Sequence, residues 1–299
     1  MKKDKPRIII IVGPTASGKS DLAIKLARKL SGEIISADSR QVYRGLDIGT
    51  GKVTKKERAV ARHHLLDISS PKKVFTVDDF KRLSQKAIFD IASRNKVSII
   101  VGGTGFYIDV LLGRMTVAEV PPNPKLRTKL EKQSTEQLFK RLKKLDPERA
   151  ETIDHKNKRR LIRALEIVIT TGNPVPKYSI QDTKYNLLWI GLKPKKLESR
   201  IKKRLDARLR QGMVKEVKGL IKKGVSYKRL YDLGLEYRWI SLYLKGSITK
   251  NEMTEKLYRD IVRYSKRQMT WFKRNKEIKW LDDPRKVASL LKSFRRLAD

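Results

Sequence analysis

The sequence predicts an α/β fold, in which a parallel sheet forms the core and an all-helical segment is inserted into it. Three observations lead to this prediction. A continuous β-branched run at residues 7–12 passes directly into a glycine-rich loop at residues 13–20. Apolar runs and helical patterns then alternate up to residue 101, which is the order of a βαβ chain. Prolines near residue 121 open a stretch with helical periodicity and no strong strand.

The core elements follow one another in the first hundred residues. Arg7–Val12 is expected to be a strand covered on both faces, because no polar residue interrupts its apolar run. The amphipathic pattern of Asp21–Leu30 predicts a helix. Apolar runs at Glu33–Ala37 and Val97–Val101 predict two more strands, with a helix at about Val77–Ser93 between them.

The pattern of alternating strands and helices ends at the prolines. Pro121 and its neighbours break the core pattern, and Gly172-Asn173-Pro174 closes the helical stretch. The sequence therefore predicts a helical insertion domain at residues 121–180, carried by a core of residues 1–120 and 181–299.

The last part of the chain returns to the core. Leu187–Leu192 is a short apolar run suited to another sheet strand. From Pro194 onward the pattern is mainly helical, with a final strand expected at Ile278–Leu281.

Composition limits the classes of function. Lys plus Arg number 71 and Asp plus Glu number 32, so the net charge is +39. Such a charge favours a polyanionic partner such as nucleic acid, although a lysine-rich organism would also produce it. The chain has no cysteine, which excludes disulfides, thiolate metal sites and cysteine nucleophiles and is consistent with a reducing cytoplasm. No apolar run reaches the length of a membrane span, so we expect no membrane partner.

The glycine-rich loop matches the phosphate-binding pattern G-x-x-x-x-G-K-[ST] between a strand and a helix. Backbone amides of such a loop converge on phosphate oxygens, and its lysine adds a point charge. The pattern predicts a P-loop NTPase-like core and a magnesium ligand at the Ser20 hydroxyl. The predicted phosphate-binding residues are Gly13, Pro14, Thr15, Ala16, Ser17, Gly18, Lys19 and Ser20.

Phosphate binding alone does not identify the reaction. The strand at Val97–Val101 ends in glycine and threonine, where an ATPase would normally carry an acidic residue. Asp38 is the only acid at the end of an early strand, and it suits an acceptor-binding base, a turn or a helix N-cap. These residues leave a small-molecule kinase open.

Six motifs in order resemble the bacterial tRNA dimethylallyltransferase family over nearly the whole chain. They are GPTASGKS, ISADSRQVYRGLDIGTGK, HHLLDI, VGGTGFY, RRLIRALEI and RYSKRQMTWF. The resemblance implies transfer of a dimethylallyl group from dimethylallyl pyrophosphate to N6 of adenine 37, in the anticodon stem-loop of tRNA, with release of pyrophosphate. It also implies Mg²⁺ as cofactor and a monomer in the cytoplasm.

The resemblance also implies the site residues. Asp38 acts on the adenine amine, Arg204 stabilises the departing pyrophosphate, and Thr104 lies near both substrates. An adenine stacked in a loop must be flipped out before it can react. The residues implied to contact tRNA, besides Asp38 and Thr104, are Ser39, Arg40, Gln41, Arg127, Arg159, Arg160, Leu161, Ile162, Arg163, Arg263, Arg267 and Gln268.

The resemblance does not account for every residue, and it leaves alternative functions open. Gly234–Arg238 departs from the family's usual sequence, so no role is implied for it. His63 and His64 are interpreted as structural, because adjacent histidines without further ligands make a poor metal site. Three alternatives remain: an adenylate isopentenyltransferase acting on free AMP, a P-loop kinase, and a nucleic-acid-binding protein that turns over nothing.

Overall fold

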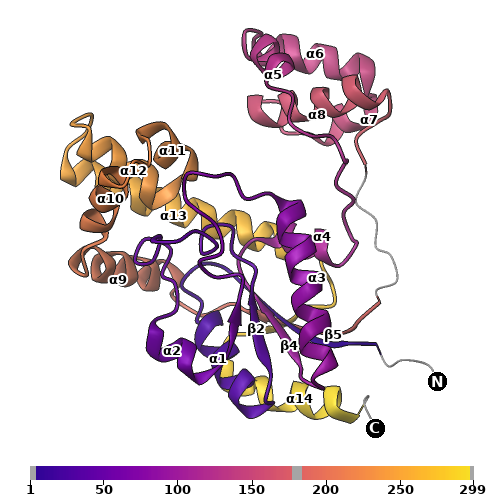
Figure 1. The fold of residues 1–299 in the computed structure, drawn as a ribbon, viewed down its shortest axis with the longest axis vertical. Coiled ribbons are helices and arrows are strands. Elements are labelled where there is room, and N and C mark those ends of the chain that lie inside the picture. The colour runs from indigo at the N-terminus through magenta and orange to yellow at the C-terminus, as the bar shows by residue number, and fades with distance from the viewer. Residues whose placement is uncertain (1–4, 177–183, 297–299) are drawn as a thin grey trace. The chain divides into compact units, whose positions relative to one another are not determined.

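The computed structural model describes residues 5–176 and 184–296. Its centre is a six-stranded parallel sheet in the order β3-β2-β4-β1-β5-β6 (Figure 1). Ile8, Ile9, Ile10 and Ile11 of β1 are fully buried, which explains why that run carries no polar residue. The strands are β1 (Arg7–Val12), β2 (Glu33–Ser36), β3 (His63–His64), β4 (Ser98–Val101), β5 (Asn186–Leu192) and β6 (Lys279–Leu281).

The order of the strands confirms the predicted α/β class and adds a detail. β1 pairs with β4 and β5, so β4 lies between β1 and β2 although it comes later in the chain. The carboxyl ends of β1, β2 and β4 therefore meet at one edge of the sheet. Ligands of open parallel sheets bind at this edge.

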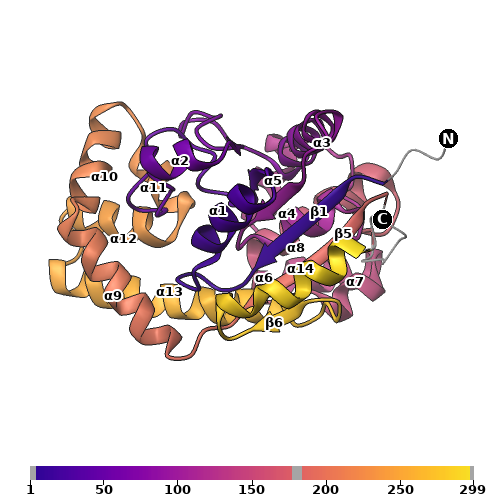
Figure 2. The same ribbon diagram turned by 90° about the horizontal axis from the view of Figure 1, so that it is seen from below.

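Helices cover the sheet on both sides. Leu22 and Leu26 of α1 (Lys19–Lys29) pack with Leu291 and Phe294 of α14 (Val287–Arg296) in one core cluster that includes alternate residues of β1. α3 (Val77–Ser93) contacts β2 and β4, and α4 (Gly105–Leu111) contacts α3. Figure 2 shows α14 and α1 beside β1 in the view from below.

A second core lies among the C-terminal helices. It joins Leu205 and Leu230 to Val42, Tyr43 and Leu46 of the segment that follows β2. This cluster fixes the segment against the helices, so residues far apart in the sequence meet beside the phosphate loop. The helices are α9 (Leu197–Arg210), α10 (Met213–Lys222), α11 (Tyr227–Leu233), α12 (Leu235–Leu244) and α13 (Lys250–Phe272).

The chain divides into two compact units, one of residues 1–111 and 182–299 and the other spanning Leu112–Gln181. The sequence predicted the first boundary at residue 121, whereas the units divide after Leu111. The predicted second boundary, at residues 180 and 181, lies outside the described residues.

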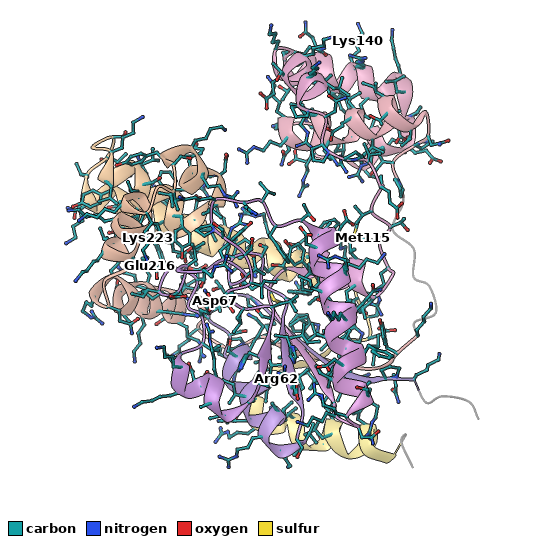
Figure 3. The ribbon with its side chains drawn as sticks, in the orientation of Figure 1. Arg62, Asp67, Met115, Lys140, Glu216 and Lys223 are labelled. Carbon is teal, nitrogen blue, oxygen red and sulfur yellow. The ribbon has the colours of Figure 1, made fainter. Side chains whose placement is uncertain are left out.

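The second unit consists of α5 (Pro124–Glu131), α6 (Thr135–Leu145), α7 (Pro147–Thr152) and α8 (Lys158–Thr171). Side chains of Asn123 and Ser134 cap the first turns of α5 and α6, and Gly172 ends α8 in the left-handed conformation. Leu138 and Leu161 are fully buried in its own core. Lys140 extends from its surface (Figure 3).

The short elements α2 (Lys55–Val60), β3 and α4 were not predicted; α2 and β3 carry no apolar period. In the part of the chain that the structure describes, no helix has the length and apolar character required to cross a membrane.

Candidate active site at the phosphate loop

The glycine-rich loop joins β1 to α1 in a conformation that only glycine permits at two positions. Gly13 has φ 145°, and a Cβ placed there would lie 2.5 Å from the carbonyl oxygen of Leu192. Gly18 has φ 90° and precedes the first turn of α1, where it supplies no capping side chain. The amides of that turn are therefore left for an external acceptor, and the helix dipole favours an anion there.

Lys19 folds back over this loop. Its Nζ atom donates to the carbonyl oxygen of Pro14 at 2.6 Å and lies 3.4 Å from the Ser17 hydroxyl. Burial lowers the pKa of Lys19 to about 7, with a further lowering from the nearby Arg204. A half-buried ammonium beside a second cation makes this point of the loop receptive to a phosphate.

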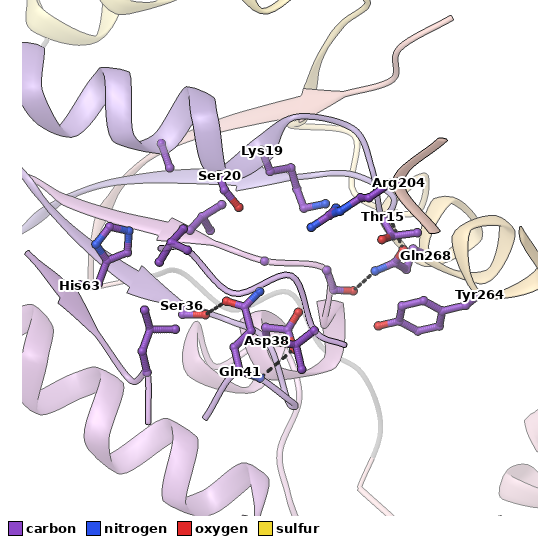
Figure 4. Close-up of a pocket in the computed structure, with 17 residues that line it drawn as sticks. Thr15, Lys19, Ser20, Ser36, Asp38, Gln41, His63, Arg204, Tyr264 and Gln268 are labelled. Carbon is purple, nitrogen blue, oxygen red and sulfur yellow. Dashed lines mark hydrogen bonds between the residues drawn. The ribbon is translucent and has the colours of Figure 1, made fainter. Parts of the chain in front are cut away.

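Gln268 of α13 connects the loop to the end of β4. Its Oε1 atom accepts from the Thr15 amide at 2.8 Å, and its Nε2 atom donates to the Gly103 carbonyl at 3.0 Å (Figure 4). A side chain at Gly103 would collide with this amide, since a Cβ there would lie 2.1 Å from Nε2. The glycine after β4 is therefore required by the bridge.

The loop borders a narrow cavity of about 80 Å³. Lys19, Ser20 and Arg204 line it together with Asp38 and Tyr264 (Figure 4). A larger cavity of about 570 Å³ shares Lys19, Ser20 and Arg204 and continues between the loop and α9. The residues around the phosphate loop thus line both cavities. Asp38 is added in the narrow one, and the larger one adds basic side chains together with Asp21 and Glu57.

Asp38 follows β2 and organises its own turn. Its Oδ1 atom accepts from the amides of Arg40 at 2.8 Å and Gln41 at 3.3 Å. In the described structure both of these bonds go to Oδ1, so Oδ2 remains to take a proton. The turn role that the sequence allowed is therefore present, and it fixes the carboxylate in the cavity.

Thr104 and Tyr264 lie beside this acid. The Ser39 amide donates to the Thr104 hydroxyl at 3.2 Å, which ties the end of β4 to the turn after β2. Burial raises the pKa of Tyr264 to about 12, so its phenol stays protonated at neutral pH. A neutral hydroxyl and a carboxylate suit the polar edge of a base.

Arg204 brings a guanidinium to the phosphate side. It lies on α9, its Nη2 atom is 3.4 Å from the Gly51 carbonyl oxygen, and burial lowers its pKa to about 10. It remains charged at neutral pH. With Lys19 it makes this part of the cavity cationic.

The residues predicted to contact RNA differ in burial and in bonding partners. Leu161 and Ile162 are buried in the core of the helical unit, which contradicts an RNA contact by their side chains. Arg127 and Arg163 both bind the buried carboxylate of Glu166, at 2.7 Å and 2.6 Å. Their guanidiniums have a structural partner that the sequence pattern did not reveal.

Of the other residues predicted to contact tRNA, some lie on the surface and some lie at the candidate active site. Arg159, Arg160, Arg263 and Arg267 are exposed. Gln268 is buried, and its side-chain amide is hydrogen-bonded through both Oε1 and Nε2. These contacts indicate that it holds the phosphate loop to the loop after β4. Ser39, Arg40 and Gln41 surround the Asp38 turn, where Arg40 donates to the Leu233 carbonyl at 2.7 Å.

The sequence assigned no site role to His63 and Tyr264, which line the narrow cavity. His63 lines the narrow cavity while its Nδ1 atom lies 2.7 Å from the Ala61 carbonyl, whereas His64 pairs with Glu33. Tyr264 and Gln268 share a face of α13, being four residues apart, and that spacing was the available signal.

The donor set fits magnesium only together with a phosphate. Among the described residues no group of three or more His, Asp or Glu side chains could hold a metal ion. The Ser20 hydroxyl lines both cavities next to Lys19. Mg²⁺ in phosphate sites is commonly held by one or two protein groups, substrate oxygens and water, and Ser20 fits that arrangement.

Comparison with known proteins gives one consistent result. A family model described as IPP transferase matches residues 41–275. The tRNA dimethylallyltransferase 1 of Citrifermentans bemidjiense is 41% identical over 296 residues, covering 97% of this chain and 96% of that protein.

Solved structures agree with the sequence match. The full-length tRNA isopentenylpyrophosphate transferase of Bacillus halodurans is 35% identical with a TM-score of 0.72, covering 98% of this chain and 99% of that one. A eukaryotic dimethylallyltransferase acting on tRNA is 28% identical with a TM-score of 0.75, covering 89% of this chain and 70% of that one.

Proposed function

The chain belongs to the IPP transferase family, and we propose that it transfers a dimethylallyl group from dimethylallyl pyrophosphate to N6 of adenine 37 in tRNA, releasing pyrophosphate. Transfer of a dimethylallyl group to tRNA is the activity for which its full-length relatives are named. The donor, the acceptor atom and the site residues are the parts of the proposal that need their own support.

One observation carries the proposal. A single narrow cavity joins the phosphate loop, through Lys19 and Ser20, to the carboxylate of Asp38 and the guanidinium of Arg204. A phosphate cradle and a fixed acid therefore face the same small space. This is the arrangement that a reaction between a pyrophosphate ester and an amine requires.

The donor side stabilises the leaving group. The bond that breaks joins the allylic carbon to a pyrophosphate oxygen, and negative charge grows on the pyrophosphate as it departs. The loop amides, Lys19 and Arg204 are already in place to receive that charge. Preorganised donors of this kind act most strongly where water is excluded.

The acceptor side handles the proton. The exocyclic nitrogen of adenine forms the new bond to the allylic carbon and loses one proton, which Asp38 accepts. Two amides hold Asp38 through Oδ1, so its second oxygen can lie against the amine. The protonated Tyr264, which lines the cavity, and Thr104, whose hydroxyl accepts from the Ser39 amide, would orient the flipped base beside it.

The proposal includes Mg²⁺, with Ser20 as the residue that would hold it. When bound with the donor, the ion neutralises pyrophosphate charge. As the family resemblance implies, the proposal also includes a monomer in the cytoplasm.

The decisive experiment offers the purified protein labelled dimethylallyl pyrophosphate and Mg²⁺. One reaction contains unmodified tRNA, a second contains the same tRNA with adenine 37 replaced by guanine, and a third contains AMP. We expect label in the first only, at N6 of adenine 37.

The other outcomes separate the alternatives. Label in AMP alone would make the protein an adenylate isopentenyltransferase. A lack of transfer together with ATP consumption would favour the kinase interpretation. Equal labelling of both tRNAs would reject adenine 37 as the acceptor while leaving prenyl transfer intact.

A further inference from the structure

The turn between α11 and α12 adopts a conformation that costs free energy. Gly234 has φ 79° and is followed by Leu235 with φ 42°, a left-handed conformation that leucine rarely adopts. The next two residues are directed inward: Glu236 is 9% exposed and Tyr237 is 1% exposed. This is the segment for which the sequence pattern implied no role.

Glu236 binds a buried arginine next to the phosphate site. Its Oε1 atom lies 3.3 Å from Nη1 of Arg208, and the same Nη1 donates to the Gly49 carbonyl at 3.1 Å. Arg208 is 8% exposed, so both charges of the pair are largely removed from water. A buried guanidinium without that carboxylate would be costly.

Arg208 is in turn a neighbour of Arg204. The two lie four residues apart on α9, so they share one face of the helix and repel each other. Gly51 lies against both guanidiniums, since a Cβ there would be 1.8 Å from Arg208 Nη2 and 2.2 Å from Arg204 Nη2. The two guanidiniums therefore lie against the same point of the loop.

Tyr237 supports the backbone that both arginines contact. Its hydroxyl lies 3.0 Å from Oε1 of Glu216, whose carboxylate accepts from the amides of Asp47, Ile48 and Gly49 at 2.9, 2.6 and 3.1 Å. Figure 3 marks Glu216 among the C-terminal helices. The loop of residues 47–51 is thus held on its amide side while its carbonyls receive the arginines.

We propose that Glu236 is a positioning residue that holds the Arg204 guanidinium in place for the pyrophosphate, acting through Arg208 and the loop of residues 47–51. The inference rests on the proposed function, in which Arg204 receives leaving-group charge. Glu236 itself is absent from the linings of both cavities, so it acts through its neighbours.

Binding of inorganic pyrophosphate with Mg²⁺, measured by calorimetry, tests the inference without requiring turnover. The cycle consists of the wild type, Arg204→Gln, Glu236→Gln and the double variant. If Glu236 positions Arg204, Arg204→Gln weakens binding about tenfold in the wild type but less than about threefold in the Glu236→Gln background. Asp206→Asn is the matched control, because that half-buried carboxylate lies on the same helix and pairs with Lys202 at 3.1 Å.

Turnover supplies a second readout. In Glu236→Gln we expect kcat for dimethylallyl transfer to fall about tenfold or more and the KM for the donor to rise by a smaller factor, because the displaced Arg204 guanidinium meets both the bound donor and the departing pyrophosphate less well. A purely structural role would instead lower the folded fraction, which thermal unfolding reports.

The outcomes are distinct. Equal costs of Arg204→Gln in both backgrounds, in folded protein, would overturn the positioning role. If the cycle shows coupling but the wild type transfers no dimethylallyl group, the positioning role stands and the proposed function fails. If Glu236→Gln does not fold, the paired exchange Arg208→Gln/Glu236→Gln leaves no lone buried charge, and the same cycle decides.

Discussion

Asp38 illustrates how one side chain serves structure and chemistry through different oxygens. Oδ1 holds the turn after β2 through two amides, while Oδ2 remains for the substrate. Asparagine can keep the first role, because its side-chain oxygen also accepts from backbone amides. Exchange of this residue can therefore separate the two.

Asp38→Asn should lower the rate of dimethylallyl transfer by about two orders of magnitude or more, the range of a lost general base. Binding of tRNA should stay nearly unchanged because the turn is kept. Single-turnover kinetics and a tRNA titration check the two expectations. Activity within a factor of a few of the wild type would reject the base assignment.

Lys19 has a pKa of about 7 because it is half-buried, and a bound pyrophosphate would raise it by supplying the opposite charge. Binding at about pH 8 should then take up nearly one proton, and uptake should disappear below about pH 6, where Lys19 is already charged.

Calorimetry of pyrophosphate binding in buffers with different ionisation enthalpies measures this uptake. The same measurement on Lys19→Gln gives the proton uptake of the ligand itself, which is subtracted from the uptake measured with the wild type. If both proteins take up the same number of protons at about pH 8, Lys19 is charged before the ligand arrives.

At the residue scale the sequence indicated the types of group in the site but not their partners. The glycine pattern predicted the loop, and the position of Asp38 after a strand predicted an acid near it. The bridge from Thr15 to Gln268 spans 253 positions of the chain, and no local period encodes such a contact. For the same reason the pairing of Arg127 and Arg163 with Glu166 was not predicted.

At the element scale, β2 depends on an acid at its first residue. The buried carboxylate of Glu33 accepts from Arg94 and Lys96 in the turn after α3 and contacts His64 of β3 at 2.8 Å. Hydrogen bonds from Arg94 are the main reason that the pKa of Glu33 is lowered to about 2. The Glu33 side chain therefore links β2 to β3 and to the turn after α3.

The stability supplied by Glu33 should depend on pH. Its pKa is lower in the folded chain than the ordinary value of 4.5, so the contribution is complete above about pH 4.5 and is lost as pH falls toward 2. Glu33→Gln should therefore destabilise the protein at pH 7 by on the order of 2 to 3 kcal/mol, and the difference from wild type should shrink in acid.

Urea unfolding of both proteins between about pH 7 and pH 3 measures this difference. Glu255→Gln serves as the control, because that exposed carboxylate on α13 pairs only weakly with Arg259 at 3.4 Å. A difference that stays constant with pH would show that Glu33 acts by packing and not by charge.

Strands with an apolar run of their own were predictable, including the three-residue β6, whereas β3 was not. The bounds of β1 and α3 agree with the apolar run and the amphipathic period from which they were predicted. β3 has two residues and is defined only by pairing with β2, so it carries no pattern of its own. The turn at Gly234 and Leu235 is likewise explained by tertiary contacts of Glu236 and Tyr237.

At the scale of the whole molecule, the net charge of +39 is the sequence feature that bears most directly on RNA binding. Neutralising phosphates with Lys and Arg releases counterions, so RNA binding should weaken steeply with salt. Net charge does not reveal which arginines contribute. The structure narrows the choice by separating guanidiniums with a buried partner from those on the surface.

Arg127 and Arg160 of the helical unit form such a pair. Arg127 binds the fully buried Glu166 through Nε at 2.8 Å and Nη2 at 2.7 Å, whereas the Arg160 side chain is exposed at the start of α8. Arg160→Ala should leave thermal unfolding unchanged, weaken tRNA binding and reduce the slope of log affinity against log salt by about one. Arg127→Ala should mainly destabilise the unit, by about 1 to 3 kcal/mol, because a buried carboxylate loses a bidentate partner.

Thermal unfolding and tRNA titrations over a salt series, carried out on both variants, test this assignment. Each variant is the control for the other, since both remove one guanidinium from the same unit and change the net charge equally. If both lower RNA affinity by the same factor at every salt concentration and neither changes stability, net charge alone accounts for binding. If Arg160→Ala has no effect at any salt concentration, that side chain lies on a passive surface and the contact implied for it is wrong.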